Sequence, residues 1–348
     1  MIHAKPAVKE KKSMNSNTIL LLLTIGLFVV MYAAGCIAYA DKGFTKLQTF
    51  LDILKNNAGL ICVTCGMTAV MITGGIDISV GAVIAMECMF LAVGVESWGL
   101  PAQLLIPLML VIGVVFGIIQ GYCVGYLGIQ PFIVTMAGMF FARGMTAVIS
   151  TNQLSITAET SQFFYDLANF RIYLPFGGTV NKAGKLIMPY IGVGVVVALV
   201  VLVAIFLILR YTKFGRSLYA VGGSEQSAAM MGLNVKKTKL KAYVLSSFLC
   251  SIGGICYCMN TMSASVNQAT GLEMDAIASS VIGGTLLTGG VGNVFGSFFG
   301  VLINGTISSL VKTNGKLSSS WPNVVTALLL CFFIVLQAIF AKVKARRS

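Results

Sequence analysis

Long apolar stretches separated by short polar ones run through almost the whole chain. A bilayer core of roughly 30 Å is crossed by a helix of about 20 apolar residues. About ten stretches approach that length, although the third and the eighth are short. They cover residues 19–39, 58–75, 78–95, 103–126, 131–150, 189–210, 241–262, 274–288, 292–311 and 322–341. The pattern therefore predicts an all-α polytopic membrane protein with about ten transmembrane helices.

Composition supports one membrane domain. Of the 348 residues, 57% are hydrophobic and only 10% are charged, which leaves too little polar surface for a soluble globule. No stretch between the spans is longer than a loop. We therefore expect a single transmembrane domain over residues 19–341, flanked by tails at 1–18 and 342–348.

Basic residues indicate the orientation. Lysine and arginine concentrate in both tails and in the segment 211–240, whose single acid is Glu225. Under the positive-inside rule all three lie in the cytoplasm, and ten crossings place them there. The loop 151–188 carries mixed charges and is expected on the periplasmic face of a bacterial inner membrane. The net charge of +13 thus reflects topology, and no nucleic-acid-binding stripe is present in the sequence.

Two spans carry glycine at every fourth position, which predicts close packing of one helix face against a neighbour. These glycines are Gly113, Gly117, Gly121 and Gly125 in one span, and Gly292, Gly296 and Gly300 in the other. Each glycine-rich span precedes one that begins with similar text, Pro131-Phe-Ile-Val-Thr and Pro322-Asn-Val-Val-Thr. An offset of five crossings would make an inverted 5+5 repeat. Chance recurrence of such text is the alternative.

Two segments interrupt the apolar text with glycine pairs. Residues 71–81 read MITGGIDISVG and residues 283–292 read GGTLLTGGVG. Irregular backbone at membrane depth survives where it lines a wet cavity or is buried in protein, so both segments are candidates for a translocation pathway or its gate. The alternative, which the topology favours, is a tight turn at each, with Asp77 and Ser79 capping the next helix.

Ionisable residues inside the spans should face the bundle interior because an unpaired charge in lipid is costly. Either Glu87 or Asp77 could pair with Arg143, or Arg143 could contact a polar substrate directly. Cys62 and Cys65 have redox or zinc spacing but no second pair, and His3 is the sole histidine, so no metal site is expected. The candidate pathway residues are Asp77, Ser79, Glu87, Thr135, Arg143 and Asp275.

The segment 211–240 is too polar to span the membrane and predicts a short cytoplasmic helix. Ser224 is a good N-cap, Glu225 suits the positive helix end, and Gly232 ends the helix. The alanine and methionine residues between them would form an exposed apolar face. Such a face either docks a partner protein or packs on the underside of the membrane bundle.

At this point the sequence resembles a known family. The Glu-x-x-Ala-Ala-x-x-Gly pattern of Glu225, Ala228, Ala229 and Gly232 is similar to the cytoplasmic coupling loop of ATP-binding-cassette importer permeases. Four collinear stretches, at 74–86, 129–144, 214–235 and 272–300, resemble monosaccharide permeases of ribose, xylose and galactose importers. Within that family, 137–144 and 315–330 look nearest to the galactofuranose permease subunits.

The resemblance implies a ten-helix permease of the vitamin-B12-importer type and several partners. These are a second permease, identical or paralogous, an ATPase that uses ATP and Mg²⁺, and a periplasmic sugar-binding protein received by the 151–188 loop. The chain itself would be no enzyme and bind no cofactor. The coupling residues would be Gly215, Ser224, Glu225, Ala228, Ala229 and Gly232.

Two other interpretations stay open. An ion-coupled secondary transporter would use intramembrane acids such as Asp77 and Glu87 as coupling sites. Within the importer class, a nucleoside or branched-chain amino-acid permease is a further alternative. An intramembrane enzyme is disfavoured because the sequence offers no nucleophile, base or metal cluster.

Overall fold

The computed structural model describes residues 16–180, 186–318 and 320–345. Within that part the chain forms fourteen helices and six strands of two or three residues. Each of the ten predicted stretches overlaps one of the helices. These are α1 (Ser16–Ala38), α3 (Ala58–Ile72), α4 (Val80–Glu96), α5 (Ala102–Gly125), α6 (Pro131–Ile149), α8 (Val193–Tyr211), α11 (Val235–Thr261), α12 (Leu272–Ile282), α13 (Val294–Asn314) and α14 (Trp321–Ala345).

Fewer helices than ten are long and apolar enough to cross a membrane on their own. Among the described residues seven qualify, namely α1, α5, α6, α8, α11, α13 and α14. Helix α2 (Leu47–Asn56) and α3 meet at a bend of 55° and would make an eighth if the pair is one broken span rather than a re-entrant loop. Helices α4 and α12 have 17 and 11 residues, shorter than a straight span needs. The protein is therefore a helical polytopic membrane protein, and the count of ten crossings stays a prediction.

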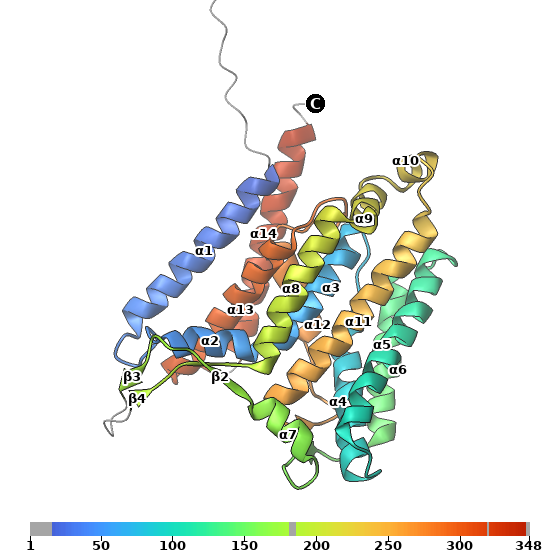
Figure 1. The fold of residues 1–348 in the computed structure, drawn as a ribbon. Coiled ribbons are helices and arrows are strands. Elements are labelled where there is room, and N and C mark those ends of the chain that lie inside the picture. The colour runs from blue at the N-terminus through green and yellow to red at the C-terminus, as the bar shows by residue number, and fades with distance from the viewer. Residues whose placement is uncertain (1–15, 181–185, 319, 346–348) are drawn as a thin grey trace, which may run out of the picture.

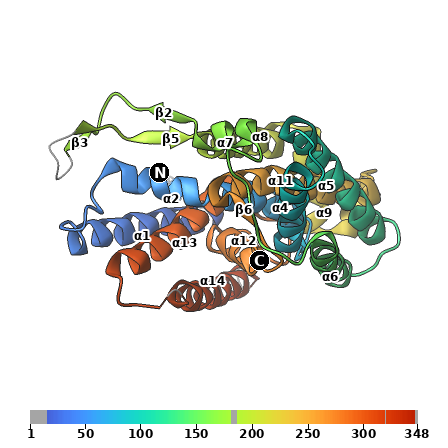
Figure 2. The same cartoon turned by 90° about the horizontal axis from the view of Figure 1, so that it is seen from below.

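The centre of the bundle is formed by helices that are apolar on all sides. Every residue of α3 is buried, and so are almost all residues of α4. A helix that is hydrophobic all round has no face for water and is expected in such a core. Helices α11 and α12 lie in the middle of the molecule, with α1 and α14 on one side and α5 and α6 on the other (Figure 2).

The glycine face of α5 packs directly on the backbone of α11. A methyl group at any of its four spaced glycines would lie 2.7–2.8 Å from a carbonyl oxygen of α11, those of Lys236, Leu240, Tyr243 and Ser247. In α13, Gly296 and Gly300 pack instead against the backbone of α12, and Gly292 precedes the helix. These contacts do not test the inverted repeat, which also stays a prediction.

The segments at the two ends of the bundle are more structured than the sequence suggested. The loop 151–188 contains α7 (Gln162–Asn169), and 211–240 contains two short helices, α9 (Lys213–Gly223) and α10 (Glu225–Met230), where one was expected. Helix α7 lies at the opposite end of the molecule from α10 (Figure 1). Helix α1 begins and α14 ends at the α10 end, as the charge pattern requires.

Among the described residues, three short antiparallel strand pairs, which the sequence did not predict, connect loop segments by backbone hydrogen bonds. The pair β1 (Leu154–Ser155) and β6 (Ser263–Ala264) joins the 151–188 loop to the residues that follow α11. The other two pairs are β2 (Arg171–Tyr173) with β5 (Tyr190–Gly192), and β3 (Thr179–Val180) with β4 (Leu186–Ile187). The described residues of the 151–188 loop are thus joined by backbone pairing to the segments that precede α8 and follow α11.

Candidate functional site

Helix α10 has the local signals that the sequence predicted. The Ser224 hydroxyl accepts a hydrogen bond from the Ser227 amide at 3.2 Å, which caps the helix N-terminus. After the helix, Gly232 adopts a φ of +81°, a conformation that suits glycine. In α9, Gly215 packs against the carbonyl groups at the end of α8, where a side chain would not fit. The direction of α10 is therefore determined at both of its ends.

One face of α10 packs on the protein and the other is exposed. Ala228 is fully buried, whereas Ala229 is exposed. Met230 and Met231 follow with exposed fractions of 82% and 69%. Large apolar side chains so exposed at one end of a molecule mark an interaction surface. One face of α10 therefore packs on the bundle, as the second interpretation predicted, and docking of a partner on the exposed face stays a prediction.

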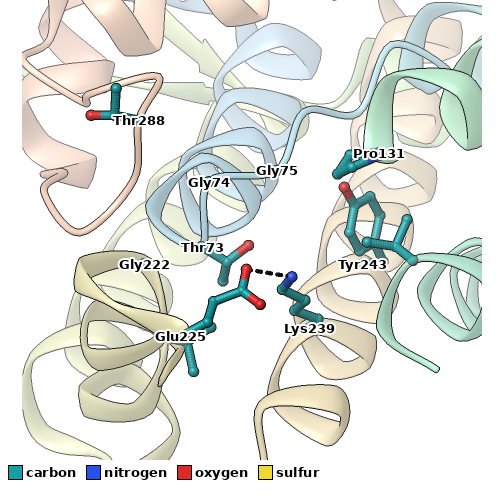
Figure 3. Close-up of a pocket in the computed structure, with 11 residues that line it drawn as sticks. Thr73, Gly74, Gly75, Pro131, Gly222, Glu225, Lys239, Tyr243 and Thr288 are labelled. Atoms are coloured by element: carbon teal, nitrogen blue, oxygen red, sulfur yellow. Dashed lines mark ion pairs between the residues drawn. The ribbon is translucent and has the colours of Figure 1, made fainter. Parts of the chain in front are cut away.

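Glu225 forms an ion pair that sequence reasoning did not foresee. Its carboxylate lies 2.6 Å from the ammonium group of Lys239, near the start of α11 (Figure 3). Within the ranges that the structure describes, it is the sole contact of this kind between a basic and an acidic side chain. Helix α10 is therefore fastened to α11 as well as to its own flanking segments.

The two glycine-broken segments meet each other and the end of α9. We call this the glycine junction: residues 72–75 after α3, 222–223 at the end of α9, and 288–290 after α12. The Gly290 amide donates to the Ile72 carbonyl at 2.8 Å. A methyl group at Gly222 would lie 2.5 Å from the Gly290 nitrogen, and one at Gly289 would lie 2.7 Å from the Gly74 nitrogen. Three backbones can approach this closely only without side chains.

The glycine junction explains why the glycines stand where they do. Gly74, Gly289 and Gly290 have φ values of +80°, +85° and +76°, so both segments are tight turns, the alternative that the topology favoured. What the sequence did not reveal is that both turns contact the segment that leads into α10. A cavity of about 260 Å³ adjoins the glycine junction, and Thr73, Glu225, Lys239 and Tyr243 contribute polar groups to its lining (Figure 3).

Beyond the cavity, Asp77 is fully buried and its carboxylate is satisfied by hydroxyl groups. One oxygen accepts from the Ser79 hydroxyl at 2.6 Å and from the Ser79 amide at 3.1 Å. The other oxygen accepts from the Ser246 hydroxyl of α11 at 3.1 Å. The Gln120 amide of α5 donates to the Ser79 hydroxyl at 2.9 Å. Asp77 therefore joins the start of α4 to α11, and Ser79 joins it to α5.

The neighbouring Ile76 carbonyl is a second meeting point. It accepts a hydrogen bond from the Tyr243 hydroxyl at 3.2 Å, and the Thr135 hydroxyl, which donates to the Pro131 carbonyl of its own helix at 2.9 Å, lies 3.4 Å from it. The structure thus brings together the predicted residues Asp77, Ser79 and Thr135. Sequence reasoning missed Gln120 of α5, and it missed Tyr243 and Ser246 of α11, although polar residues at helical spacing in the apolar span 241–262 were a visible signal for the latter two.

The remaining predicted pathway residues lie apart, and neither predicted ion pair with Arg143 forms. Glu87 accepts from the Ser251 hydroxyl at 2.5 Å. Arg143 instead donates to the Val266 and Gln268 carbonyls, each at 2.8 Å. Backbone oxygens thus accept from the guanidinium, and hydroxyls donate to Asp77 and to one oxygen of Glu87, whose other oxygen, Oε2, is buried without a hydrogen-bond partner in the described residues. Asp275 is half-buried near Asn304. Among the residues described, no three potential ligands are grouped to hold a metal ion.

Comparison with known proteins places these features in a family. A family model described as "Branched-chain amino acid transport system / permease component" matches residues 49–334. The inner membrane ABC transporter permease protein YjfF of Escherichia coli is 40% identical over 318 residues, 91% of each chain. The fructose import permease protein FruG of Bifidobacterium longum is 35% identical over 331 residues, 95% of this chain and 94% of the relative. The ribose import permease protein RbsC of Haemophilus influenzae is 31% identical over 305 residues, 88% of each.

No solved structure matches the chain. The family model extends from α2 into α14, and it includes the whole of α10, the glycine junction and the Asp77 segment. The relatives align over nearly the full length of both proteins. The protein therefore belongs to this family of membrane permease components of transport systems.

Proposed function

We propose that this chain is the membrane permease of an ATP-driven importer that carries a monosaccharide into a bacterial cell. The observation that carries the proposal is the position of α10. It exposes Met230 and Met231 at one end of the bundle, while the segment before it contacts both glycine-broken turns. Relatives that are named as fructose and ribose import permeases support the sugar. Galactofuranose is the sugar to test first, because stretches 137–144 and 315–330 look nearest to its permeases.

The proposed partners follow from the two ends of the molecule. An ATPase, which binds ATP and Mg²⁺ itself, would dock on α10 from the cytoplasm. A periplasmic sugar-binding protein would dock at the other end, on the 151–188 loop with its α7 helix. A second permease, identical or paralogous, would complete the membrane part. In this arrangement both tails and α10 are cytoplasmic, and the single transmembrane domain 19–341 crosses ten times in the manner of the vitamin-B12 importer.

The contacts support a mechanical route from ATP to the sugar pathway. When the ATPase subunits close, they would displace α10 and with it the end of α9. Gly222 lies against the Ile72 carbonyl and the Gly290 amide, so both turns of the glycine junction must respond. The turn after α3 leads directly into Ile76 and Asp77, which precede α4 and accept hydrogen bonds from Tyr243 and Ser246 of α11. A small movement of α10, the coupling helix, would thereby change how α3, α4 and α11 are positioned relative to one another.

Docking on α10 can be tested by making its exposed face polar. Replacing both Met230 and Met231 by Gln should reduce the ATPase that co-purifies with the permease by about tenfold or more, since a fully buried Met side chain contributes roughly 1.5–3 kcal/mol. Met274→Gln, at a residue that is 54% exposed at the start of α12, is the matched control and should leave the yield of ATPase unchanged. Normal ATPase recovery with the double variant would refute docking at this face.

The substrate is tested by uptake into cells that express the complete importer. Radiolabelled galactofuranose, ribose, xylose and fructose are compared with leucine, because the description of the family model names branched-chain amino acids. We expect uptake of one of the sugars that depends on the ATPase and on its ability to hydrolyse ATP. Uptake of leucine alone would favour the amino-acid alternative. Uptake by the chain alone under an ion gradient would favour a secondary transporter.

A further inference from the structure

The choice of Lys239 as the partner of Glu225 is specific. Four lysines lie within residues 236–241, and Lys236, Lys237 and Lys241 are all exposed. Lys239 alone points inward, and its side chain is 19% exposed against 53% for Glu225. Glu225 is the single acid in 211–240, and it pairs with the one lysine of that segment that is partly buried. An incidental surface contact would not require that selection.

Lys239 begins a stripe of polar side chains along one face of α11. Tyr243 and Ser246 follow it at the fourth and seventh positions, the spacing of a single helix face. Each member of the stripe contacts a different segment. Lys239 binds Glu225 of α10, Tyr243 donates to the Ile76 carbonyl, and Ser246 donates to the Asp77 carboxylate. The stripe therefore connects the coupling helix to the segment between α3 and α4.

The part of α11 that carries this stripe is packed closely against α5. The α5 glycines pack against its backbone from Lys236 to Ser247, so this stretch moves together with α5. In front of it, Lys239 and Tyr243 line the cavity of about 260 Å³ that also reaches Glu225 and Thr73. Figure 3 shows Lys239 and Glu225 extending toward each other between α11 and α10, with Tyr243 farther along α11. The ion pair thus joins α10 to α11 at the edge of this cavity.

We propose that Lys239 is a positioning residue that joins the coupling helix to α11, so that movement of α10 is transmitted through α11 to Ile76 and Asp77. This proposal rests on the proposed function, in which α10 receives the movement of an ATPase. It assigns Glu225 a role within the chain, where the alternative is direct contact with the ATPase. Transmission then has two routes, one through the glycine junction and one through the Lys239 stripe.

Substitutions at Lys239 separate the two roles because they leave Glu225 in place. In the complete importer, with ATPase and binding protein co-expressed, Lys239→Met should lower sugar uptake about fivefold, while Lys239→Arg should retain it. Lys239→Glu should lower uptake about tenfold or more, since it places two carboxylates together. Lys241→Glu is the control, because it changes the loop charge equally at an exposed position on the same helix.

The charges can also be exchanged. The double variant Glu225→Lys with Lys239→Glu should restore uptake to within about threefold of wild type, whereas each single reversal fails. Uptake is measured with radiolabelled galactofuranose, ribose, xylose and fructose. ATP hydrolysis by the purified complex is measured in parallel, and we expect more ATP to be hydrolysed per sugar in Lys239→Met than in Lys239→Arg. A residue with a merely structural role would lower both rates together.

Two results would overturn the inference. One is a Lys239→Glu variant that behaves like Lys241→Glu. The other is a Lys239→Met variant that keeps the wild-type ratio of ATP to sugar, combined with an exchanged pair that transports no better than the worse single variant. Failure of the proposed function itself is recognised separately, because the wild-type importer would then take up none of the four sugars.

Discussion

The contact between α5 and α11 offers the sharpest test of the packing. We consider replacement of Gly117 and Gly121 by Leu. A Cβ atom at Gly117 would lie 2.8 Å from the Tyr243 carbonyl oxygen and the Val244 Cα atom, and ordinary contacts of this kind begin at 3.4 Å. At Gly121 the nearest atoms are the Leu240 carbonyl oxygen at 2.8 Å and its Cα at 2.9 Å. These are backbone atoms, so no side chain can rotate away.

The magnitude follows from that geometry. Two helices must separate by about 0.6 Å to admit even the first carbon of each new side chain, and further to admit the rest. Overpacking costs about 1–3 kcal/mol for each site in a well-packed core. Replacing glycine in a helix returns up to about 1 kcal/mol per site. We therefore expect a net loss of about 3 kcal/mol, a large share of a typical stability of roughly 5–15 kcal/mol.

The assay is thermal unfolding of the purified permease in detergent, followed by size-exclusion chromatography. A loss of about 3 kcal/mol should lower Tm by roughly 4 °C for a chain of this size. The matched control replaces Gly26 of α1 and Gly144 of α6 by Leu, because a Cβ at either position meets no atom within 4 Å. It adds the same two side chains and should keep the wild-type Tm or raise it slightly.

A double α5 variant that is monodisperse and melts within about 2 °C of wild type would refute the reasoning. It would mean that α5 and α11 separate without cost, and hence that the glycines do not determine their distance. A control variant that melts as low as the α5 variant would show instead that leucine at any helical glycine is harmful. The close approach to α11 would then have no special part in stability.

Three further outcomes are expected. Asp77→Asn should lower uptake about tenfold, because the amide has one acceptor oxygen where the carboxylate has two, so the donors of either Ser79 or Ser246 lose their acceptor; uptake within about twofold of wild type would remove Asp77 from the functional residues. In a cysteine-free background, a membrane-impermeant thiol reagent added to intact cells should label Tyr165→Cys but not Gln226→Cys, and labelling of the second would reverse the proposed topology. Arg143→Gln should destabilise the loop after α11 by about 1.5–3 kcal/mol, measured as a lower Tm, since two carbonyl groups lose a charged donor; an unchanged Tm would contradict this.

The sequence by itself determined what local forces decide. The apolar stretches became the long helices, because burying or immersing them in lipid outweighs other local preferences. Helix α10 begins after Ser224 and ends before Gly232, as capping rules predict, because capping depends on atoms within a few residues. The similarity of 74–86, 129–144, 214–235 and 272–300 to monosaccharide permeases also pointed to the family that the comparisons support. The locations of α4 and α12 were predictable, but whether such short helices cross the bilayer was not.

Only the tertiary structure decided which of these elements touch. The glycine pattern of α5 and that of α13 look alike, yet one packs on α11 and the other on α12. The sequence offered the carboxylates of Asp77 and Glu87 as partners of Arg143, which donates to two backbone carbonyl groups instead. The glycine junction joins residues near 74, 222 and 290, and Ser246 reaches Asp77 across 169 positions. Such contacts depend on how whole helices lie against one another, which the pattern of nearby residues does not contain.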